Sequence, residues 1–353
     1  MTPEPNADAV AERILQAALG TIDLLAVHLG DRLGWYRSLA GEGPASSSEL
    51  AVRTNTSERY AREWLEQQAI TGILVLNDDG DTRRFTLPAA AAEVLTDSNS
   101  LNYLAPLARM FAGAAVQMPA LLDAYRAGTG VGWSDFGEDV LQSQADMNRP
   151  WFHRELERAL NQAPDLVSRL QAEETTIADI GCGAGWSTIS LARRFPTAKV
   201  TGFDVDAASI DLARVNAADS GSAVEFEHID AAGLPADRFD AVFAFECIHD
   251  LPYPVEVLAS ARQSLRTGGT VVVMDEAVAD AFQPPCDDVE RLMYGFSLLI
   301  CLPDGMSHPN SAATGTVMRR ATLSGYALAA GFRDVRVLPI EGFGFFRFYE
   351  LLP

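Results

Sequence analysis

The stretch that decides the fold is Asp179-Ile-Gly-Cys-Gly-Ala-Gly-Trp186, which lies between a predicted strand at 177–180 and a predicted helix at 187–194. Glycines between a strand and a helix let the backbone turn tightly and approach a ligand closely. A dinucleotide-binding turn has its third glycine three residues after the second. Here Trp186 stands at that position and the third glycine comes early, at Gly185. The acid two residues before the first glycine suits an ammonium group better than a pyrophosphate.

Strands and helices are predicted to alternate around this turn. Apolar runs predict strands, and apolar residues spaced three and four apart predict helices. The expected strands are 177–180, 199–203, 224–228, 239–245 and 270–274, and the expected helices are 187–194, 208–217 and 255–265. This alternation implies an α/β fold with a Rossmann-like, doubly wound parallel sheet. Two last strands, 335–340 and 345–351 around Gly342 to Gly344, predict an antiparallel hairpin at the C-terminal edge.

The N-terminal region is predicted to be mainly helical, with one hairpin. The expected elements are a long helix at 8–39, a helix opened by Ser48 with Glu49 in its first turn, a helix from the N-cap Ser57 to Gly72, and strands at 73–76 and 84–87 around a polar Asp-Gly turn at 77–81. Helices followed by a hairpin are typical of a winged helix.

These patterns divide the chain into three parts. Residues 1–97 form the winged-helix domain, residues 98–172 a helical linker, and residues 173–353 the sheet domain with a helical insert at 282–318. The linker contains a glycine-rich break from Gly128 to Phe136. It is not a phosphate-binding loop, because no Gly-Lys-Ser/Thr follows it. The break is either a hinge or substrate lid, or an ordinary loop between two helices.

The chain is strongly acidic, with a formal net charge of −21 over 353 residues. Such a charge repels phosphate backbones and anionic membrane surfaces. The helix at 57–72 carries three glutamates beside two arginines, whereas a DNA-recognition helix is basic on one face. We therefore expect no nucleic-acid partner and no membrane partner. The winged helix is interpreted as the dimerisation module of a homodimer, to which the apolar first helix contributes.

The cysteines and histidines predict neither disulfides nor a metal site. The cysteines are Cys182, Cys247, Cys286 and Cys301, with no C-x-x-C pattern, and the five histidines are scattered. This usage favours reduced thiols and no metal bound by sequence neighbours. The first residues lack the basic and apolar regions of a signal peptide, and no apolar stretch is long enough to span a bilayer. We therefore expect a cytoplasmic protein.

Polar residues also follow the other predicted strands, at the edge where ligands of open parallel sheets bind. Asp204 ends the second strand, at the distance where an acid accepts hydrogen bonds from a ribose diol. Asp230 and Ala231 follow the third strand, where an adenine could be recognised. His249 follows the fourth strand, and Asp275 ends the fifth.

Together, residues 178–275 resemble class I S-adenosylmethionine (SAM) dependent methyltransferases in the order and spacing of these segments. The resemblance implies SAM as the cofactor and S-adenosylhomocysteine as its product. It implies that the methionine end is shaped by Asp179, Gly181, Gly183 and Gly185, that Asp204 holds the ribose, and that Asp230 and Ala231 flank the adenine. A Rossmann-like sheet that binds another nucleotide is the alternative.

The whole chain is similar to dimeric small-molecule O-methyltransferases of plants and actinobacteria, which join an acidic winged helix, a helical linker and a C-terminal methyltransferase domain. Four segments carry the similarity to an actinobacterial branch: Trp133-Ser-Asp135, Met147-Asn-Arg-Pro150, His249-Asp-Leu-Pro-Tyr-Pro254 and Thr314-Gly-Thr-Val-Met318.

The resemblance implies that His249 is the catalytic base and Asp275 the acid that orients it. Histidine is the natural base near neutral pH. The chain departs from the family at Leu251 and Pro252, where a tryptophan and an acid are expected, and near Val317, where a second flanking glutamate is expected. The alternative is that His249 is a hydrogen-bonded turn residue.

His153 and His308 are rival bases. The aromatic residues predicted to line an acceptor pocket are Trp133, Phe136, Phe152 and Tyr294, with core packing as the alternative for the insert. The expected function is methyl transfer to a small, fairly apolar acceptor, at a hydroxyl oxygen. The alternatives are N-, S- or C-methylation, a SAM-dependent reaction without methyl transfer, and a non-catalytic SAM-binding winged-helix regulator.

Overall fold

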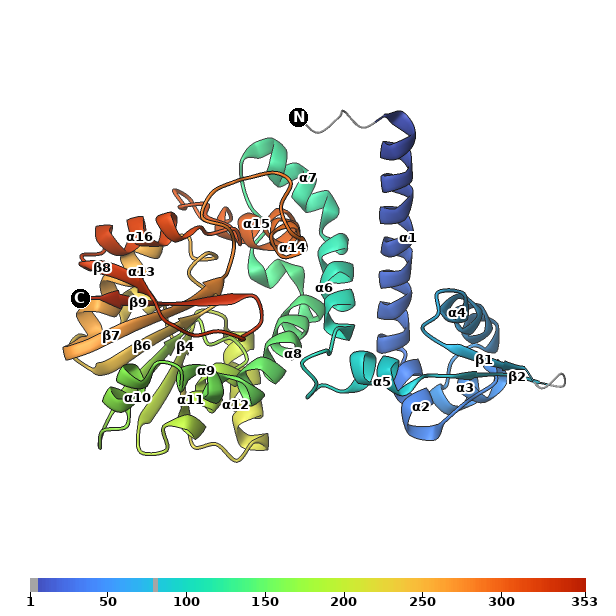
Figure 1. Cartoon of the computed structure of the whole chain (residues 1–353), viewed down its shortest axis with the longest axis horizontal. Helices are drawn as coiled ribbons and strands as arrows, with labels where there is room; N and C mark the ends of the chain where they lie inside the picture. The colour runs from blue at the N-terminus through green and yellow to red at the C-terminus, as the bar shows by residue number, and fades with distance from the viewer. Residues whose placement is uncertain (1–5, 79–81) are drawn as a thin grey trace. The chain divides into compact units, whose positions relative to one another are not determined.

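A computed structural model describes residues 6–78 and 82–353 (Figure 1). The chain divides into two compact units, Met1–Gly113 and Ala114–Pro353. Helix α6 (Ala105–Val116) crosses this division, so the segment expected as a linker is shared between the units. Within the described residues, none of the helices combines the length and the apolarity that crossing a membrane requires.

The N-terminal unit contains the predicted helices followed by a hairpin, which confirms the winged helix. Its further elements are α1 (Ala7–Arg32), α2 (Trp35–Glu42), α3 (Ser47–Thr54), α4 (Glu58–Ile70), β1 (Val75–Asp78), β2 (Arg83–Thr86) and α5 (Ala89–Thr96). The single helix expected at 8–39 is wrong, because Gly34 interrupts it with a φ of 72° that glycine adopts without a Cβ clash. Residues 79–81 of the expected hairpin turn lie outside the described residues.

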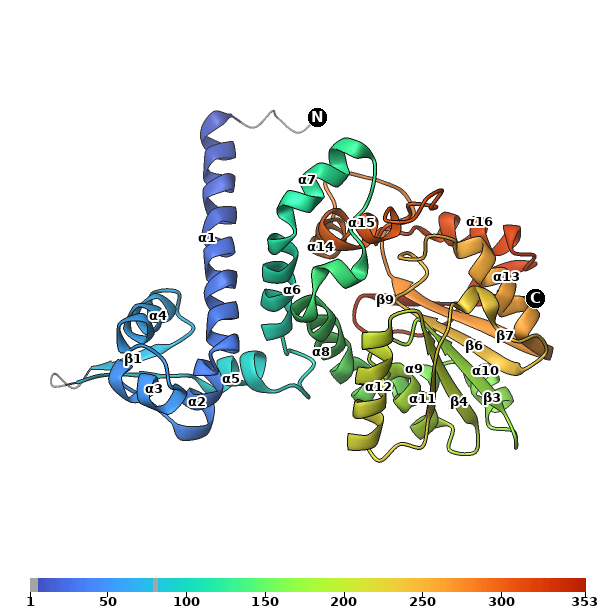
Figure 2. The same cartoon turned by 180° about the vertical axis from the view of Figure 1, so that it is seen from behind.

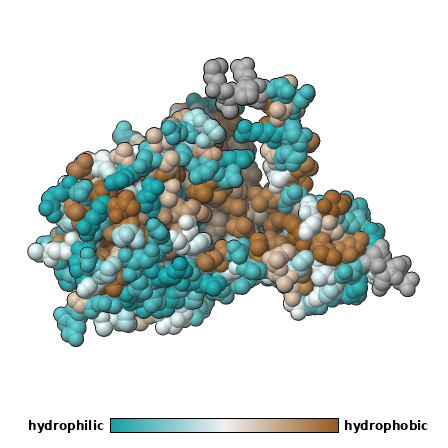
Figure 3. Space-filling view, in the orientation of Figure 1, coloured by the Kyte–Doolittle hydropathy of each residue, from teal (hydrophilic) through white to brown (hydrophobic). Residues whose placement is uncertain are grey.

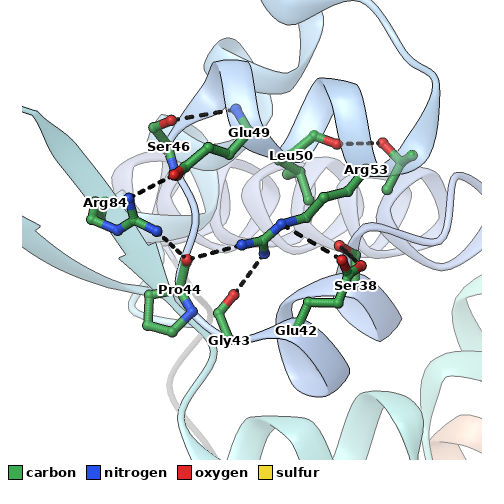
Figure 4. Close-up of polar contacts among 10 residues, drawn as sticks. Ser38, Glu42, Gly43, Pro44, Ser46, Glu49, Leu50, Arg53 and Arg84 are labelled. Atoms are coloured by element: carbon green, nitrogen blue, oxygen red, sulfur yellow. Dashed lines mark hydrogen bonds and ion pairs between the residues drawn. The ribbon is translucent and has the colours of Figure 1, made fainter.

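Polar contacts fix the start of α3 (Figure 4). The helix is capped by Ser46 and not opened at Ser48, which corrects the expected boundary. Ser46 and Glu49 form a capping box, in which the Ser46 amide donates to Oε2 of Glu49 at 2.7 Å and the Glu49 amide donates to Oγ of Ser46 at 3.3 Å. Arg84 of the hairpin donates to Glu49 at 2.8 Å and to the Pro44 carbonyl at 2.7 Å. These bonds connect the hairpin to the helix start.

Aromatic packing holds the helices of this unit together. The rings of Trp35 and Trp64 lie 4.8 Å apart, and the ring of Tyr36 meets Trp64 edge-on at 4.9 Å. The indole of Trp64 donates to the Ala26 carbonyl of α1 at 2.9 Å. A Cβ on Gly30 would lie 2.4 Å from the Trp64 ring. Glycine is therefore required where α1 meets α4.

The C-terminal unit is built on a seven-stranded sheet with the order β5-β4-β3-β6-β7-β9-β8. The strands are β3 (Thr176–Ile180), β4 (Lys199–Asp204), β5 (Glu225–His228), β6 (Phe239–Phe245), β7 (Leu265–Glu276), β8 (Asp334–Val337) and β9 (Phe346–Leu352). The first five strands in this order are parallel, and β9 is antiparallel to both β7 and β8. The predicted doubly wound sheet with an antiparallel C-terminal hairpin is confirmed.

Helices cover both faces of this sheet (Figures 1 and 2). They are α8 (Glu138–Arg154), α9 (Leu156–Leu160), α10 (Pro164–Leu170), α11 (Trp186–Arg194), α12 (Ala207–Asp219), α13 (Pro254–Ser264) and α16 (Arg320–Ala329), whereas α7 (Met118–Ala127) lies beside the helices of the insert. On one face, Ile177, Phe243 and Val272 of the strands pack with α9, α10 and α11. On the other face, the neighbouring residues Ala178 and Val242 pack with α13 and α16. Successive strand residues point to opposite faces, so both faces are apolar.

The insert at 282–318 contains α14 (Asp288–Phe296), a π-helical turn (Ser297–Cys301) and α15 (Leu302–Gly305). The glycine-rich loop of the same unit docks on α15. The Val131 amide donates to the Pro303 carbonyl at 3.0 Å, and the Trp133 amide donates to Asp304 at 2.7 Å. A Cβ on Gly130 would lie 2.1 Å from the Pro303 carbonyl oxygen. Glycine therefore allows this loop and the insert to touch backbone to backbone.

Candidate functional site

The glycine turn joins β3 to α11. Gly181, Gly183 and Gly185 have φ values of 64°, 50° and 81°. A Cβ on Gly181 would lie 2.6 Å from Cβ of Cys247, and one on Gly185 would lie 2.7 Å from the Phe226 ring. These two positions need glycine for packing as well as for the backbone conformation. Gly183 differs, because a Cβ there would meet nothing within 4 Å, which leaves its backbone approachable by a ligand.

Asp179 lies fully buried at the end of β3. One carboxylate oxygen, Oδ2, accepts hydrogen bonds from the hydroxyls of Ser187 and Thr188, both at 2.6 Å. The other oxygen, Oδ1, is buried and has no hydrogen-bond partner among the described residues. Burial raises the pKa of Asp179 to about 7. The carboxylate therefore lacks a cationic or hydrogen-bonding partner on one side.

Asp204 ends β4 and is half-buried. Its Oδ2 accepts from the Gly183 amide at 2.8 Å, and its Oδ1 accepts from the Asp206 amide at 2.9 Å. Burial raises the pKa of Asp204, while the bonds from the backbone oppose that rise. Each carboxylate oxygen has a second lone pair. Asp204 therefore ties the glycine turn to β4 and keeps capacity to accept further hydrogen bonds.

Asp230 and Ala231 follow β5. Asp230 is exposed, and its Oδ1 accepts from the Ala232 amide at 2.8 Å, which caps a short 3₁₀ turn. Ala231 is buried against the apolar cluster that includes Ile248. The pair therefore offers one polar and one apolar group at the same edge of the sheet as Asp204.

His249 lies in the turn after β6, and its side chain is only 3% exposed. Its Nδ1 lies 2.9 Å from Oδ1 of Asp275, and its Nε2 lies 3.3 Å from Oδ1 of Asp250. A carboxylate only accepts, so Nδ1 is the donor to Asp275. Burial lowers the pKa of His249, but Asp250, Glu276 and Asp275 together raise it well above its usual range. The predicted pair of His249 and Asp275 is thus in contact.

Further carboxylates surround this imidazole. Oε2 of Glu276 lies 3.3 Å from Nδ1 of His249, so Glu276 supplies a second acid where the sequence offered none near Val317. Burial raises the pKa of Glu246 to about 7 and holds that of Glu276 well above its usual range. Two carboxylate oxygens of this cluster, Glu246 Oε2 and Asp275 Oδ2, are buried without a hydrogen-bond partner among the described residues, whereas Asp250 Oδ1 and Glu276 Oε2 lie within ion-pair distance of His249.

Cys301 reaches the same cluster from the π-helical turn of the insert. Its thiol shares a hydrogen bond with Asp250, and burial together with Asp250 raises its pKa to about 12. Sequence analysis missed Cys301 and Glu276. The signal for Glu276 was its place beside Asp275 at the end of β7, whereas nothing local marks Cys301.

The predicted pocket residues differ in exposure. Phe136 and Phe152 are buried, and Phe152 packs edge-on against the Phe245 ring at 5.3 Å in the core beneath the sheet. Trp133 and Tyr294 are partly exposed. Trp133 is held through its amide by Asp304, and the Tyr294 hydroxyl accepts from Arg319 at 3.3 Å.

The surroundings of the two rival bases, His153 and His308, differ from those of His249. His153 is exposed, and its Nδ1 lies 3.0 Å from Nη1 of Arg193. Partial burial and Arg193 lower the pKa of His153. His308 is exposed, and its ring meets Tyr253 edge-on at 6.4 Å. Of the three candidates, His249 is the one that described carboxylates hold in place.

Comparisons with known sequences agree with this arrangement. A family model for a methyltransferase domain matches residues 177–269, and a model for an Rv2258c-like winged HTH domain matches residues 20–97. Ubiquinone biosynthesis O-methyltransferase of Nitrosococcus oceani is 37% identical over 98 residues, which are 27% of this chain and 41% of that protein. The same enzyme of Roseobacter denitrificans is 36% identical over 110 residues, 31% of this chain and 44% of that protein. The chain thus matches less than half the length of these relatives.

Solved structures share the fold over nearly the whole chain. Human N-acetylserotonin methyltransferase, crystallised with SAM, aligns with a TM-score of 0.72 and 17% identity, covering 100% of this chain and 99% of that one. A putative O-methyltransferase of Nostoc punctiforme aligns at 0.70 and 20% identity, with 99% and 100% covered. Mitomycin 7-O-methyltransferase aligns at 0.69 and 21% identity, with 98% of each chain covered. The chain therefore contains a winged helix-turn-helix domain followed by a SAM-dependent methyltransferase domain.

Proposed function

We propose that this chain transfers a methyl group from SAM to a hydroxyl oxygen of a small, fairly apolar molecule. The observation that carries the proposal is the contact between His249 and Asp275, 2.9 Å apart, at the carboxyl ends of β6 and β7. This pair lies next to the glycine turn, because Cys247 of the same loop packs against Gly181. Methylation of a hydroxyl requires alignment of the acceptor and removal of its proton. The site combines a cofactor turn with an oriented imidazole.

The residues around the turn fit the cofactor. Buried Asp179 has an oxygen without a partner, which suits the ammonium group of a methionine moiety. Asp204 keeps capacity to accept hydrogen bonds from the hydroxyls of a ribose, and the open face of Gly183 allows close approach. We assign the edge formed by Asp230 and Ala231 to the adenine. When bound, SAM supplies a methyl group on a positively charged sulfur.

His249 is the proposed base, and Asp275 is its positioning residue. The hydrogen bond from Nδ1 to Asp275 leaves Nε2 as the atom that accepts the proton. The surrounding carboxylates favour the protonated imidazole. A cation bound beside the imidazole disfavours protonation, so occupation of the cofactor site prepares His249 for its role.

The acceptor is proposed to lie under the glycine-rich loop and the insert, against Trp133 and Tyr294. Both side chains are partly exposed and are tied in place, through Asp304 and Arg319 respectively. Phe136 and Phe152 are buried, and Phe152 packs against Phe245 in the core, so we assign the exposed part of the wall to Trp133 and Tyr294 alone. Aromatic walls with few polar groups suit an apolar small molecule.

We further propose that the chain is a homodimer through its N-terminal unit. Helix α1 exposes a series of large apolar side chains, Val10, Ile14, Leu15, Leu19, Ile22, Leu25 and Leu29, and apolar residues are visible along this helix in Figure 3. Patches of this kind usually mark contact surfaces. A second copy of the same acidic chain would cover this stripe through apolar contacts, which need no pairing of opposite charges.

A cytoplasmic location is also part of the proposal. The four cysteines are free thiols, which is the usual state of cysteines in proteins of reducing compartments.

Methyl transfer is tested by incubating the protein with SAM carrying a labelled methyl group and with a panel of hydroxylated aromatic molecules. Matched amines and thiols with the same ring systems form the control panel. We expect the label on oxygen, together with S-adenosylhomocysteine. Label only on nitrogen, sulfur or carbon would reassign the acceptor atom. Absence of transfer, despite tight SAM binding, would contradict the catalytic proposal.

A further inference from the structure

Arg149 of α8 lies beside the glycine turn without an acidic partner. Its guanidinium carbon, Cζ, is 4.8 Å from the centre of the Trp186 ring, and Trp186 is the first residue of α11. Nε of Arg149 is buried, and nothing in the described part of the chain accepts a hydrogen bond from it. We propose that Arg149 binds the carboxylate of the cofactor's methionine moiety.

An arginine without a partner is unexpected in so acidic a chain. The sequence has 48 acidic residues against 27 lysines and arginines, so acids are available to most basic side chains. Arg194, which also stacks on an aromatic ring, donates to Oδ1 of Asn161 at 2.7 Å. Arg149 is half-buried and keeps its donors unused. A planar carboxylate matches the fork of a guanidinium, so a carboxylate ligand would supply the missing partner.

The start of α11 also favours an anion next to Trp186. The residue before the helix is Gly185, which has no side chain to cap it, and the first turn contains no acid. The first amides of a helix lack partners within the helix and carry a partial positive charge. Anions bind readily at such a helix end. The uncapped amides and the guanidinium of Arg149 therefore favour negative charge at the same place.

The other end of the glycine turn has the opposite charge. Asp179 ends the strand that enters the turn, it is fully buried, and its Oδ1 has no hydrogen-bond partner among the described residues. A methionine moiety carries both an ammonium group and a carboxylate. Asp179 suits the ammonium group, and Arg149 suits the carboxylate. A pyrophosphate would meet Arg149 as well, but it has no cationic group for Asp179.

The stack on Trp186 orients the guanidinium before a ligand arrives. A guanidinium over an indole face is held by the attraction between the cation and the ring. Because the fork is already placed, less side-chain freedom is lost when a carboxylate binds. A lysine at position 149 would keep the charge but could not present two parallel donors.

The same helix contacts the neighbourhood of His249. Asn148, the residue before Arg149, donates a hydrogen bond to Glu246, which directly follows β6. One turn further along α8, Phe152 packs edge-on against Phe245 at 5.3 Å. A carboxylate held by Arg149 would tie α8 to the cofactor. Occupation of the cofactor site should therefore hold α8 more firmly over the end of β6.

This inference rests on the proposed position of the methionine end at the glycine turn, and it adds a residue outside that turn. Methyl transfer itself does not require it, because Arg149 is assigned no contact with the reacting atoms. Its role is to position the cofactor and to select ligands that carry a carboxylate.

The test is calorimetric titration of the full chain with S-adenosylhomocysteine and with its decarboxylated analogue, which keeps the ammonium group. The wild type should bind S-adenosylhomocysteine about tenfold more tightly or more, as expected for hydrogen bonds to a charged group. Arg149→Gln should remove this preference by weakening the binding of S-adenosylhomocysteine alone, and Arg149→Lys should keep part of it. Arg194→Gln is the matched control, because Arg194 also stacks on a ring, and it should bind both ligands as the wild type does.

A measurement on the unaltered protein guards against variants that fail to fold. Hydrogen exchange of the amides of α8 should slow when S-adenosylhomocysteine is added, and less so with the decarboxylated analogue.

Three results would overturn the role of Arg149: equal affinity of the wild type for the two ligands, equal protection of α8 by both, or a loss in Arg149→Gln that is the same for both. The proposed function fails separately, if the wild type binds neither ligand at millimolar concentration or binds SAM without transferring its methyl group. Preference for the carboxylate without methyl transfer would leave the assignment of Arg149 standing.

Discussion

Oδ1 of Asp275 lies 2.9 Å from Nδ1 of His249 because β7, which carries Asp275, ends beside β6, which leads into the turn that carries His249. Phe245 at the end of β6 pairs in parallel with Met274 of β7. The next residue of β7 is Asp275, while the chain after β6 turns at Glu246, which has a φ of 52°. This turn brings the imidazole back over the end of β7. The sheet register thus creates the pair that we propose as catalytic.

Replacing His249 by alanine should reduce turnover by about 10²- to 10⁴-fold, because general-base catalysis contributes on that order. Binding of SAM, measured by calorimetry, should change little. Asp275→Asn should also lower turnover while retaining SAM binding, since the amide still supports the ring but no longer carries charge. His153→Ala is the control and should behave as the wild type does. Near-normal turnover of His249→Ala would remove His249 from the role of base.

Two glycines of the turn should respond differently to alanine. At Gly185, a Cβ would clash with Phe226 at 2.7 Å, and the φ of 81° is unfavourable for alanine. We expect Gly185→Ala to lower the free energy of unfolding by about 2 to 4 kcal/mol, from overpacking and backbone strain together. Gly183→Ala should cost only the strain, about 1 to 2 kcal/mol.

The effect on SAM affinity should not follow the effect on stability: Gly183→Ala, which destabilises the fold less than Gly185→Ala does, should still weaken SAM binding. The methyl group of Gly183→Ala would project into the open space that the ligand uses, so binding weakens although the fold is kept. Chemical denaturation and calorimetry on both variants check this. A Gly183→Ala protein with unchanged affinity would show that the ligand does not approach this backbone.

The buried carboxyl of Asp179 should make stability depend on pH. Its pKa is raised to about 7 in the folded chain, from the usual value of 3.8 for this carboxyl. Between these values the folded state holds more protons than the unfolded state, so the free energy of unfolding falls as the pH rises, and this loss is complete above about pH 7. Asp179→Asn should remove this contribution.

Urea unfolding of the ligand-free protein from about pH 5.5 to about pH 8 measures how steeply the free energy of unfolding changes with pH. The wild type should lose more stability over this range than Asp179→Asn. Equal slopes for the two proteins would mean that Asp179 is already ionised throughout.

The exposed stripe of α1 should hold the homodimer together. Ile14 and Ile22 are 64% and 56% exposed in the chain, so a double change to glutamate should not harm the fold of one protomer. It should convert a dimer into a monomer, as seen by light scattering after gel filtration. Val52→Glu is the matched control, because Val52 is an equally apolar, 83% exposed residue on α3. A wild-type monomer, or a double variant that stays dimeric, contradicts the proposed interface.

The elements of the cofactor domain could be predicted because their signals are local. The spacing of Asp179, Gly183 and Asp204 places all three at one edge of a parallel sheet, and the structure joins Gly183 to Asp204 at 2.8 Å. The sequence indicates less clearly that β9 lies between β7 and β8 in the sheet. Its buried Glu350 interrupts an otherwise apolar strand, and its charge is met by Arg169 and Arg336 from distant segments.

The cluster around His249 could be predicted only in part. His249 and Asp275 follow from the resemblance to known enzymes, and Glu276 from its neighbour. Cys301 comes from the insert, and its approach to Asp250 depends on how a π-helical turn packs over the sheet. No periodicity in the sequence encodes such a contact, so the sequence predicts only a reduced thiol at this position.

The central claim is that residues 177–269 form a working SAM site. Its most direct test is calorimetric titration of the purified chain with SAM and with S-adenosylhomocysteine, beside the variant Asp204→Ala. We expect saturable binding of both ligands, and loss of about tenfold or more in Asp204→Ala, because the variant removes the hydrogen bond from Gly183 and the oxygens that we propose accept from the ribose. Lack of binding to either ligand at millimolar concentration, by a folded wild-type chain, would contradict the account.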